Sequence, residues 1–436
     1  LSYAVGGWDP PWGIELRVDT LNALVVLIVS AVGAVTASFA RRSIIAEVPA
    51  RRRSLFYSAW MLCFTGLLGI ALTGDAFNLF VFLEISSLSS YVLIAMGRDR
   101  RALTAAFQYL IMGTIGATFL LIGVGLLYMM TGTLNMADLA QRLPDLAGTR
   151  TIQAAFAFLT VGISLKVAVF PLHLWLPNAY AYAPSAVSAF LAATATKVAL
   201  YTLLRFGFTV FGPEYAFEAM SFQYVLLPVS LAGILIASLV AIFQADAKRL
   251  LAYSSVAQIG YMTLGVSLAS ATGVAAAVLH LFNHALMKGA LFLALGCVVY
   301  RAGSCRIDRM AGLGRSMPWT MAAFVIGGLS LIGVPLTAGF ISKWYLVLAA
   351  VERGYWPVAA IIVIASLLAA IYVWRVIESA YLRPAPPGRE AVTEAPLSLL
   401  VPTWLLAGAN IFFGIDTRLP VGAALASAGQ LLGVAP

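Results

Sequence analysis

The stretch Lys166-Val-Ala-Val-Phe-Pro171-Leu-His-Leu-Trp-Leu-Pro177 places a lysine in an apolar run that two prolines interrupt. Proline removes a backbone donor and clashes with the preceding turn, so free carbonyl groups are left that must face protein or water. A second interruption, Gly333-Val-Pro, is followed by another lysine, Lys343. Interrupted helices in corresponding positions indicate inverted repeats and an ion site near the middle of a membrane.

The composition is that of a polytopic helical membrane protein. Of the 436 residues, 61% are hydrophobic and only 10% are charged, and the mean hydropathy is +0.94. Apolar stretches of about twenty residues, long enough to cross a bilayer, recur along almost the whole chain. They predict an all-α fold with twelve spans, at 20–40, 54–73, 76–97, 102–130, 152–170, 184–210, 222–244, 250–270, 273–300, 318–345, 356–381 and 397–415.

The loops between these spans alternate in charge, which predicts their orientation. One set is rich in arginine: 41–53, 98–101, 248–249, 301–315 and 383–389. The other set is acidic or balanced: 9–19, 75, 131–151, 214–218, 352–353 and 416–418. The positive-inside rule places the first set in the cytoplasm, so both ends of the chain are expected to face outward. This clustering also accounts for the net charge of +9 without nucleic acid.

The chain is expected to form one transmembrane domain over 1–436. Its five-helix repeats would cover about 54–210 and 222–381, and a final helix with a tail would cover 397–436. The tail from Pro420 is typical of an apolar surface helix rather than a span. Because the sequence starts without methionine or a signal peptide, we expect an N-terminal segment to be missing. The three cysteines form no CxxC pattern, which argues against disulfides, zinc and c-type haem.

The five lysines are placed differently from the arginines. Only Lys248 lies in an obvious loop, whereas four lie in or against apolar runs: Lys166, Lys197, Lys288 and Lys343. A lysine at the bilayer centre costs about 2.5–3.5 kcal/mol, so four of them require an explanation. Arginine stays protonated, but a desolvated lysine can lose its proton near neutrality, so the pattern indicates proton transport. Arg205 and Arg375, nearer span ends, are expected to be interfacial anchors.

Other ionisable residues fit a proton relay. Glu84 lies well inside its span, so it either pairs with a buried lysine or is held by backbone hydrogen bonds. His280, His284 and Lys288 share one helical face over about 12 Å, which suits proton hopping, although buried histidines are often only structural. Lys343 could instead extend to the membrane surface. His173 lies between prolines, in either a gate or a rigid connector.

No cofactor or metal site is expected. A b-type haem needs histidines from two facing helices, and His280 and His284 lie on one. No strand precedes a glycine-rich phosphate loop, because no strands are predicted. A redox or quinone-binding enzyme, an inert scaffold and a stand-alone transporter remain the alternatives to a relay.

Five blocks of sequence, in order, resemble one known family. They are 77–84, 166–197, 246–261, 280–291 and 339–343. The chain is similar to the antiporter-like proton-translocating subunits of respiratory complex I, membrane hydrogenases and Mrp-type cation/proton antiporters. Gly6-Gly-Trp8, Pro11-Trp-Gly-Ile14 and Asp19 most resemble the D-type subunit of Mrp antiporters. The resemblance covers about 15–415 and implies a fourteen-helix fold of which this chain carries the third to fourteenth.

The resemblance also implies roles for individual residues. Glu84 would pair with the broken-helix Lys166 and tune its proton affinity, and Lys197 would be the connecting lysine. His280 and His284 would form the central relay, and Lys343 would be the second broken-helix lysine. Lys288 and His173 are further candidates that rest on their positions alone.

Together, these features predict a proton-translocating subunit of an Mrp-type antiporter in a bacterial inner membrane. It would act only with other membrane subunits and would carry no redox cofactor. Sodium or potassium are candidate counter-ions. The alternative is a proton-pumping subunit of a complex I-like NADH:quinone oxidoreductase or a membrane hydrogenase.

Overall fold

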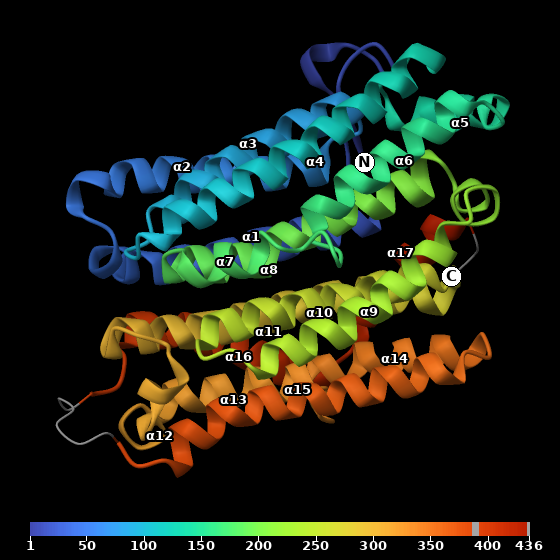
Figure 1. Cartoon of the computed structure of the whole chain (residues 1–436). Helices are drawn as coiled ribbons and strands as arrows, with labels where there is room; N and C mark the ends of the chain where they lie inside the picture. The colour runs from blue at the N-terminus through green and yellow to red at the C-terminus, as the bar shows by residue number, and fades with distance from the viewer. Residues whose placement is uncertain (386–391, 434–436) are drawn as a thin grey trace.

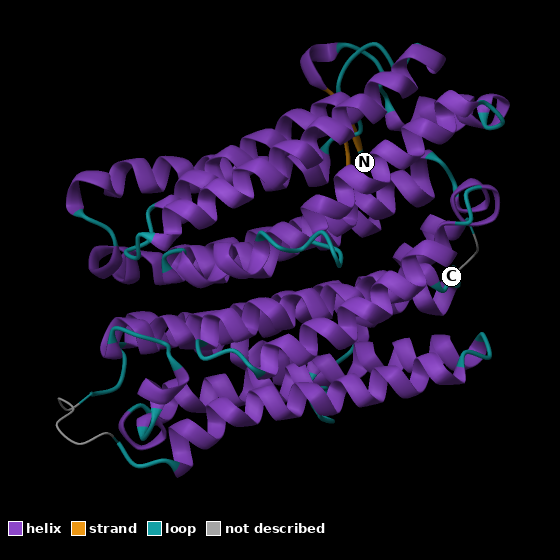
Figure 2. Cartoon of the chain, in the orientation of Figure 1, coloured by secondary structure: helices purple, strands orange, loops and turns teal. Residues whose placement is uncertain are grey.

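The computed structural model describes residues 1–385 and 392–433, and nearly all of them are helical (Figure 2). The helices are α1 Thr20–Glu47, α2 Arg53–Leu72, α3 Ala76–Ala95, α4 Arg101–Thr131, α5 Met136–Leu146, α6 Arg150–Val167, α7 Leu176–Tyr182, α8 Ser185–Leu204, α9 Phe222–Ile242, α10 Ala247–Ser267, α11 Ala271–Ala302, α12 Leu313–Ser316, α13 Pro318–Ile332, α14 Ala338–Glu352, α15 Trp356–Leu382, α16 Leu397–Ile415 and α17 Arg418–Leu432. The predicted all-α class is confirmed. The expectation of no strands is wrong in one detail, because β1 (Ser2–Ala4) and β2 (Glu15–Arg17) form a small antiparallel pair.

Polar side chains begin several of the apolar helices. Asp75, Asp246 and Ser270 each accept a hydrogen bond from the backbone N–H three residues later, at 2.7, 3.1 and 3.1 Å respectively. Such caps satisfy backbone donors that have no partner inside the helix. The starts of α3, α10 and α11 are therefore fixed by local sequence.

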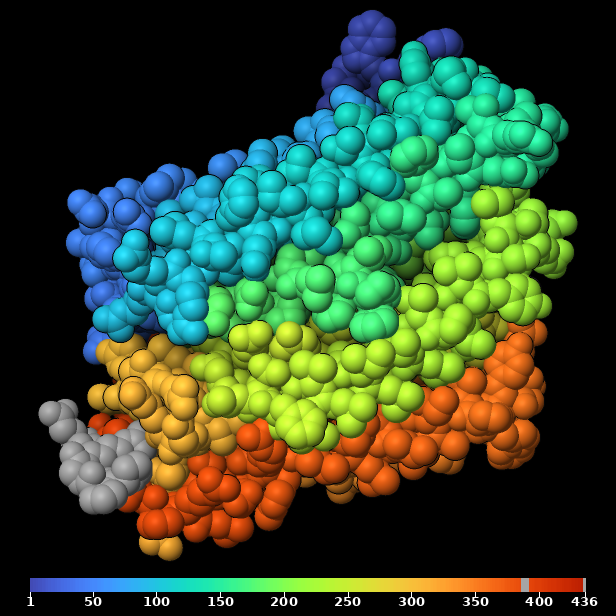
Figure 3. Space-filling model, viewed as in Figure 1, coloured from blue at the N-terminus to red at the C-terminus, as the bar shows by residue number. Residues whose placement is uncertain are grey.

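The helices form two bundles that lie side by side (Figure 1). One bundle contains α1–α8, and the other contains α9–α16. On the face seen in Figure 3 the two bundles meet along a continuous seam, where α7 packs on α10. The helices α8 and α11 are 94% buried over their apolar windows, whereas α4, α9 and α15 are 39% buried. Side chains on α8 and α11 are thus shielded from lipid by other helices.

The charged loops separate as the sequence predicts. The arginine-rich loops lie at one end of the bundles, and the N-terminus, α5 and the end of α17 lie at the other (Figure 1). We call these the inward and the outward end. Arg389, which belongs to the predicted inward set, lies outside the described residues.

All twelve predicted spans fall on helices, with some different boundaries. Nine helices in the described part of the chain are long and apolar enough to cross a membrane. The others are α6 and α10, which carry charged and polar residues, and α13 and α14, which a break divides. The count of twelve therefore stays a prediction. The tail from Pro420 forms most of α17, a 15-residue helix that buries Ala424, Ala428 and Leu431, and its place at the membrane surface stays a prediction; residues 434–436 are not among those described.

Both predicted breaks are present. Helix α6 ends at Val167, and Ala168 has a left-handed φ of 64°. Helix α13 ends at Ile332, and Gly333 and Leu336 have φ of 90° and 68°. Only glycine adopts such angles without strain, so the non-glycine residues must be held in place by their surroundings.

Candidate functional site

Glu84 of α3 and Lys166 of α6 form a pair inside the first bundle. The Lys166 Nζ lies 3.6 Å from Glu84 Oε1, and it donates a hydrogen bond of 2.8 Å to the Ser87 hydroxyl. The Lys166 side chain is 5% exposed and that of Glu84 is 25% exposed. Among the described residues, Glu84 Oε1 has no hydrogen-bond donor. The lysine is therefore deeply buried next to a carboxylate that also reaches the edge of the bundle.

The first break is stabilised by aromatic side chains. The Trp175 Nε1 donates to the carbonyl of Leu165 at 3.0 Å, and its ring stacks on Tyr109 at 3.9 Å. The free carbonyls of this break do not form a pocket around the Lys166 ammonium in the described residues, since this amine contacts Ser87 and Glu84 instead. A carbonyl pocket of this kind does occur at the second break.

His173 lies in the segment after the first break. It is 7% exposed, its ring stacks on Phe170 at 5.3 Å, and it approaches Tyr253 of α10 edge-on at 6.4 Å. Its Nδ1 has no hydrogen-bond partner among the described residues. The structure thus places His173 at the contact between the two bundles.

Lys197 is fully buried on α8 and lacks a carboxylate partner in the described part of the chain. Its Nζ donates to the Ala192 carbonyl and, at 3.4 Å, to the Thr196 hydroxyl. Helix α8 packs on α11, the helix that carries His280 and His284. Lys197 thus lies on the helix of the first bundle that packs against the helix of the two histidines.

His280 joins three helices. Its Nδ1 lies 2.8 Å from the Ser342 hydroxyl of α14, and its Nε2 lies 2.9 Å from Gln258 Oε1 of α10. The amide oxygen only accepts, so Nε2 carries a proton, and Nδ1 can accept from the Ser342 hydroxyl. Both neighbours fix the ring in a single orientation.

His284 lies one turn from His280 and has a different environment. The two rings are nearly parallel, at 8°, with centroids 6.1 Å apart. His284 is fully buried, and neither ring nitrogen has a partner among the described residues. Unpaired polar atoms in such a position are the expected place for water that the helices enclose.

The remaining two lysines bind backbone carbonyls. Lys288 donates to the Leu251 carbonyl at 2.8 Å and to the Ser254 hydroxyl, both on α10. Lys343 donates to the carbonyls of Leu331 and Ile332, at 3.0 Å each. These carbonyls end α13 at the second break, where the helix dipole is negative and stabilises a cation.

Lys343 also contacts the Ser366 hydroxyl at 3.0 Å and the face of the Tyr261 ring at 4.8 Å. Its side chain is buried, with 6% exposed. The alternative that it extends to the membrane surface is therefore wrong.

The candidate relay residues are not joined by a continuous series of hydrogen bonds among the described residues. The described part of the chain has no direct bond between Lys166 and Lys197 or between His284 and Lys288. Sequence reasoning missed Ser87, Gln258 and Ser342. Gln258 had a usable signal, because it is a polar residue in the middle of an apolar span.

Two further expectations are corrected. Lys248 does not lie in a loop, because α10 begins at Ala247 and buries Lys248 to 4% exposed. Arg205 is not an interfacial anchor, because it is buried and forms an ion pair of 2.5 Å with Asp19. Arg375 donates to the Gln244 carbonyl at 3.1 Å.

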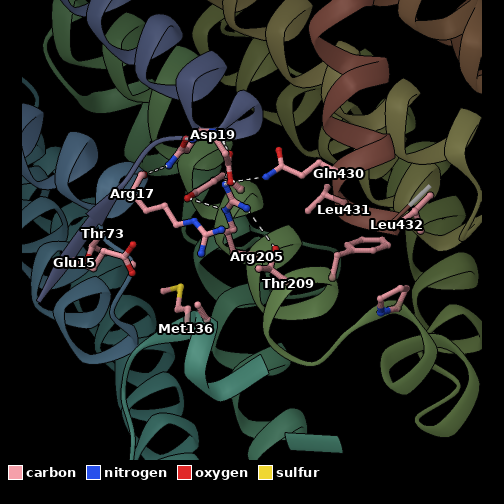
Figure 4. A pocket seen from close by; sticks show the side chains of 17 residues that line it. Glu15, Arg17, Asp19, Thr73, Met136, Arg205, Thr209, Gln430, Leu431 and Leu432 are labelled. Carbon is pink, nitrogen blue, oxygen red and sulfur yellow. Dashed lines mark hydrogen bonds and ion pairs between the residues drawn. The ribbon is translucent and has the colours of Figure 1, made fainter. Parts of the chain in front are cut away.

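The Asp19–Arg205 pair borders a cavity of 430 Å³ at the outward end (Figure 4). Tyr201 accepts from Arg205 Nε at 3.0 Å, and Gln430 of α17 donates to Asp19 at 2.9 Å. Burial by itself raises the pKa of Asp19, but the Arg205 charge and the hydrogen bonds outweigh it and hold the pKa below 3.8. The pair thus joins α1, α8 and α17.

The described residues contain no group of three His, Cys, Asp or Glu side chains that could hold a metal ion. The buried polar side chains of the described residues include lysine amines, imidazoles, hydroxyls, amides and carboxylates. Amines, imidazoles and carboxylates accept and release protons.

Comparison with known proteins gives consistent matches over almost the whole chain. The chain is 46% identical to the N subunit of the NADH-quinone oxidoreductase of Desulforudis audaxviator, over 95% of this chain and 84% of that protein. It is 31% identical to the D subunit of the Na(+)/H(+) antiporter of Alkalihalophilus pseudofirmus, over 98% of this chain and 85% of that protein. A chain of the Mrp complex from Dietzia superposes on this chain with a TM-score of 0.90 at 28% sequence identity. The match covers 99% of this chain and 87% of that chain. Residues 73–369 match the family model described as NADH:quinone oxidoreductase/Mrp antiporter, transmembrane. The chain therefore belongs to the family of membrane subunits that NADH:quinone oxidoreductases and Mrp antiporters share.

Proposed function

We propose that this chain is a proton-translocating subunit of a multisubunit cation/proton antiporter of the Mrp type. Protons would move along Glu84, Lys166, Lys197, His280, His284 and Lys343, with Lys288 and His173 beside this path. The observation that carries the proposal is the pair of Glu84 with Lys166, 3.6 Å apart and next to a broken helix.

The proposed step depends on the distance between these two side chains. Two opposite charges about 4 Å apart attract by about 4 kcal/mol at the effective dielectric constant of a protein. About 1.4 kcal/mol changes an equilibrium constant tenfold. Separating the pair therefore lowers the proton affinity of the Lys166 amine by roughly a thousandfold. Near Glu84 the amine keeps its proton; apart from it, the buried ammonium releases the proton towards Lys197.

The proposal extends to repeats, partners and location. We assign the inverted repeats to 54–210 and 222–381, each with one break, and the final helix to 397–436. The partners are other membrane subunits of one complex, in a bacterial inner membrane, and the exchanged cation is sodium or potassium. The matches to multisubunit membrane complexes support this setting.

A second candidate is the proton-pumping subunit of a quinone-linked complex. It is favoured by the 46% identity to an NADH-quinone oxidoreductase subunit, compared with 31% to an antiporter subunit. Purification of the native complex separates the two candidates. An antiporter complex acidifies or alkalises vesicles when a sodium or potassium gradient is imposed, whereas a quinone-linked complex does so when it is given an electron donor and a quinone.

The test of the proposed relay is Lys166→Ala in the purified complex, reconstituted into vesicles with a pH-sensitive dye. We expect coupled proton movement to fall about a hundredfold or more, because the variant loses the only amine next to Glu84 in the described structure. Assembly of the complex should be unchanged. Normal proton movement in an assembled Lys166→Ala complex contradicts the proposal.

A further inference from the structure

A second buried charged cluster lies at the inward end, away from the relay. It contains Glu47 at the end of α1, Ser185 at the start of α8 and Lys248 at the start of α10. Glu47 is 7% exposed and Lys248 is 4% exposed. Burying a carboxylate and an ammonium is costly, and the proposed relay does not use either of them.

One serine hydroxyl joins the two charges. Lys248 Nζ donates to Ser185 Oγ at 3.1 Å and to the Ala183 carbonyl at 3.3 Å. Ser185 Oγ in turn donates to Glu47 Oε2 at 3.1 Å, and the Ser185 backbone N–H donates to the same oxygen at 2.9 Å. Ser43 donates to the other oxygen, Oε1, at 2.5 Å.

This order of groups is a short proton wire, because a hydroxyl donates and accepts at once. An N–H bond of Lys248 breaks as its proton binds Ser185 Oγ. The former hydroxyl proton leaves Oγ and binds Glu47 Oε2. The charged pair becomes a neutral amine and a carboxylic acid, and no atom or electron is gained or lost.

A cavity brings the inward solution close to this wire. It has a volume of 270 Å³ and is lined by residues that flank both ends of the Lys248–Ala183 contact. Asp246 and Arg249 come from the start of α10, and Ala181 and Tyr182 directly precede Ala183. Arg101 and Arg306 from the inward loops complete the wall together with Gln244 and Ala245.

The same helix leads from the cluster to the relay. Lys248 is the second residue of α10, and the Leu251 carbonyl and Ser254 hydroxyl that bind Lys288 follow on the next turns. Six helical residues span about 9 Å, a distance that a few waters bridge. Lys288 is one turn from His284 on α11.

We propose that Lys248, with Ser185 and Glu47, is the inward-side proton port of the relay. It exchanges protons with the inward solution through the cavity beside Asp246 and Tyr182, and it supplies Lys288. This inference rests on the proposed proton-translocating function. The competing role is static: Glu47 would only anchor the start of α8, whose positive dipole end favours a carboxylate.

Two serines provide a matched test in the reconstituted complex. Ser185 and Ser43 both donate to Glu47, but only Ser185 lies between Glu47 and Lys248. We expect Ser185→Ala to slow proton movement about tenfold or more and Ser43→Ala to change it by less than about twofold. Ser185→Thr keeps the hydroxyl and should restore the rate.

Lys248→Arg is the second variant, because it keeps the positive charge but does not release protons. If Lys248 is a proton port, Lys248→Arg should slow proton movement as much as Ser185→Ala does. If the cluster only anchors α8, Lys248→Arg should leave the rate unchanged. Equal effects of the two serine variants, or a normal rate in Lys248→Arg, overturn the inference. If Ser185→Ala does not assemble, Lys248→Arg decides alone.

Lys166→Ala, measured alongside, separates this inference from the proposed function. If Lys166→Ala is inactive and Lys248→Arg has a normal rate, only the proposed proton port is contradicted. A fully active Lys166→Ala removes the proposed relay, whatever the serine variants do.

Discussion

The buried lysines differ in what stabilises each ammonium. Lys166 has a carboxylate at 3.6 Å, and Lys343 has two carbonyls at the end of a helix. Among the described residues, Lys197 and Lys288 each have only a carbonyl and a hydroxyl as partners. A buried ammonium without a carboxylate is the more costly one to keep charged. In the proposed relay, Lys197 and Lys288 would therefore hold a proton briefly, and Lys166 would hold it until Glu84 moves.

Glu84 is the residue at which this difference can be tested. Glu84→Gln keeps the shape but removes the charge, so we expect proton movement to fall about tenfold to a hundredfold. Glu84→Asp keeps the charge on a shorter side chain and should lose less. The measurement is dye-monitored proton movement in the reconstituted complex. Equal rates for both variants would show that the charge of Glu84 has no part in coupling.

Asp19 gives a prediction for pH. Its pKa in the folded protein lies below 3.8, so the Arg205 pair stabilises the fold above about pH 4 and is lost as the pH falls further. We expect Asp19→Asn to cost about 2 kcal/mol near neutral pH, between the values for exposed and buried pairs. The melting temperatures of the two proteins should approach each other as the pH falls below the ordinary pKa of an aspartate.

Asp138→Asn is the control for Asp19, because Asp138 also pairs with an arginine at the outward end. Its partner Arg142 is 48% exposed, so the change should cost at most about 0.5 kcal/mol. A similar loss of stability in both variants would mean that burying the Asp19–Arg205 pair does not add to its contribution to the free energy of unfolding.

At the scale of elements, the second break depends on a close contact of backbones. A Cβ placed on Gly339, in the first turn of α14, would lie 1.8 Å from the Ser330 carbonyl oxygen of α13. The Gly339 N–H also donates a hydrogen bond of 3.1 Å to the Ser330 hydroxyl. Helix α14 carries both Ser342 and Lys343, so the contact positions two groups of the site.

Gly339→Ala should therefore push α14 away from α13. We expect a loss of about 1–3 kcal/mol, as for other overpacked sites, and a slower proton movement because Lys343 moves from its carbonyls. Gly408→Ala on α16 is the control, because a Cβ there meets nothing within 4 Å. It should be neutral or stabilise by about 0.5–1 kcal/mol. Melting temperature and proton movement, measured on both variants, check this prediction.

At the scale of the whole molecule, the arrangement of the loops predicts sidedness. Arginine-rich loops lie at one end and α5 lies at the other (Figure 1). A cysteine at the inward Arg309 and one at the outward Asp145 should react with a membrane-impermeant thiol reagent from opposite sides of the membrane. The native cysteines Cys63, Cys297 and Cys305 are buried, so they should react slowly. Labelling of both positions from one side would contradict the predicted orientation.

The sequence by itself determined the features that depend on neighbouring residues. The all-α class, the positions of the helices, both breaks and the stripe of His280, His284 and Lys288 follow from apolar length, from proline and glycine, and from the helical period. These are local properties of the backbone, so they can be predicted without knowing what the helix packs against.

Only the tertiary structure decided which side chains meet. Gln258 and Ser342 hold His280 from helices 22 and 62 residues away in the sequence, and α10 starts early enough to bury Lys248 beside Ser185. It also placed the Lys343 amine, but not that of Lys166, on the carbonyls of a break. The reason is physical: the period of a helix fixes the direction of a side chain, whereas its partner is fixed by how distant helices pack.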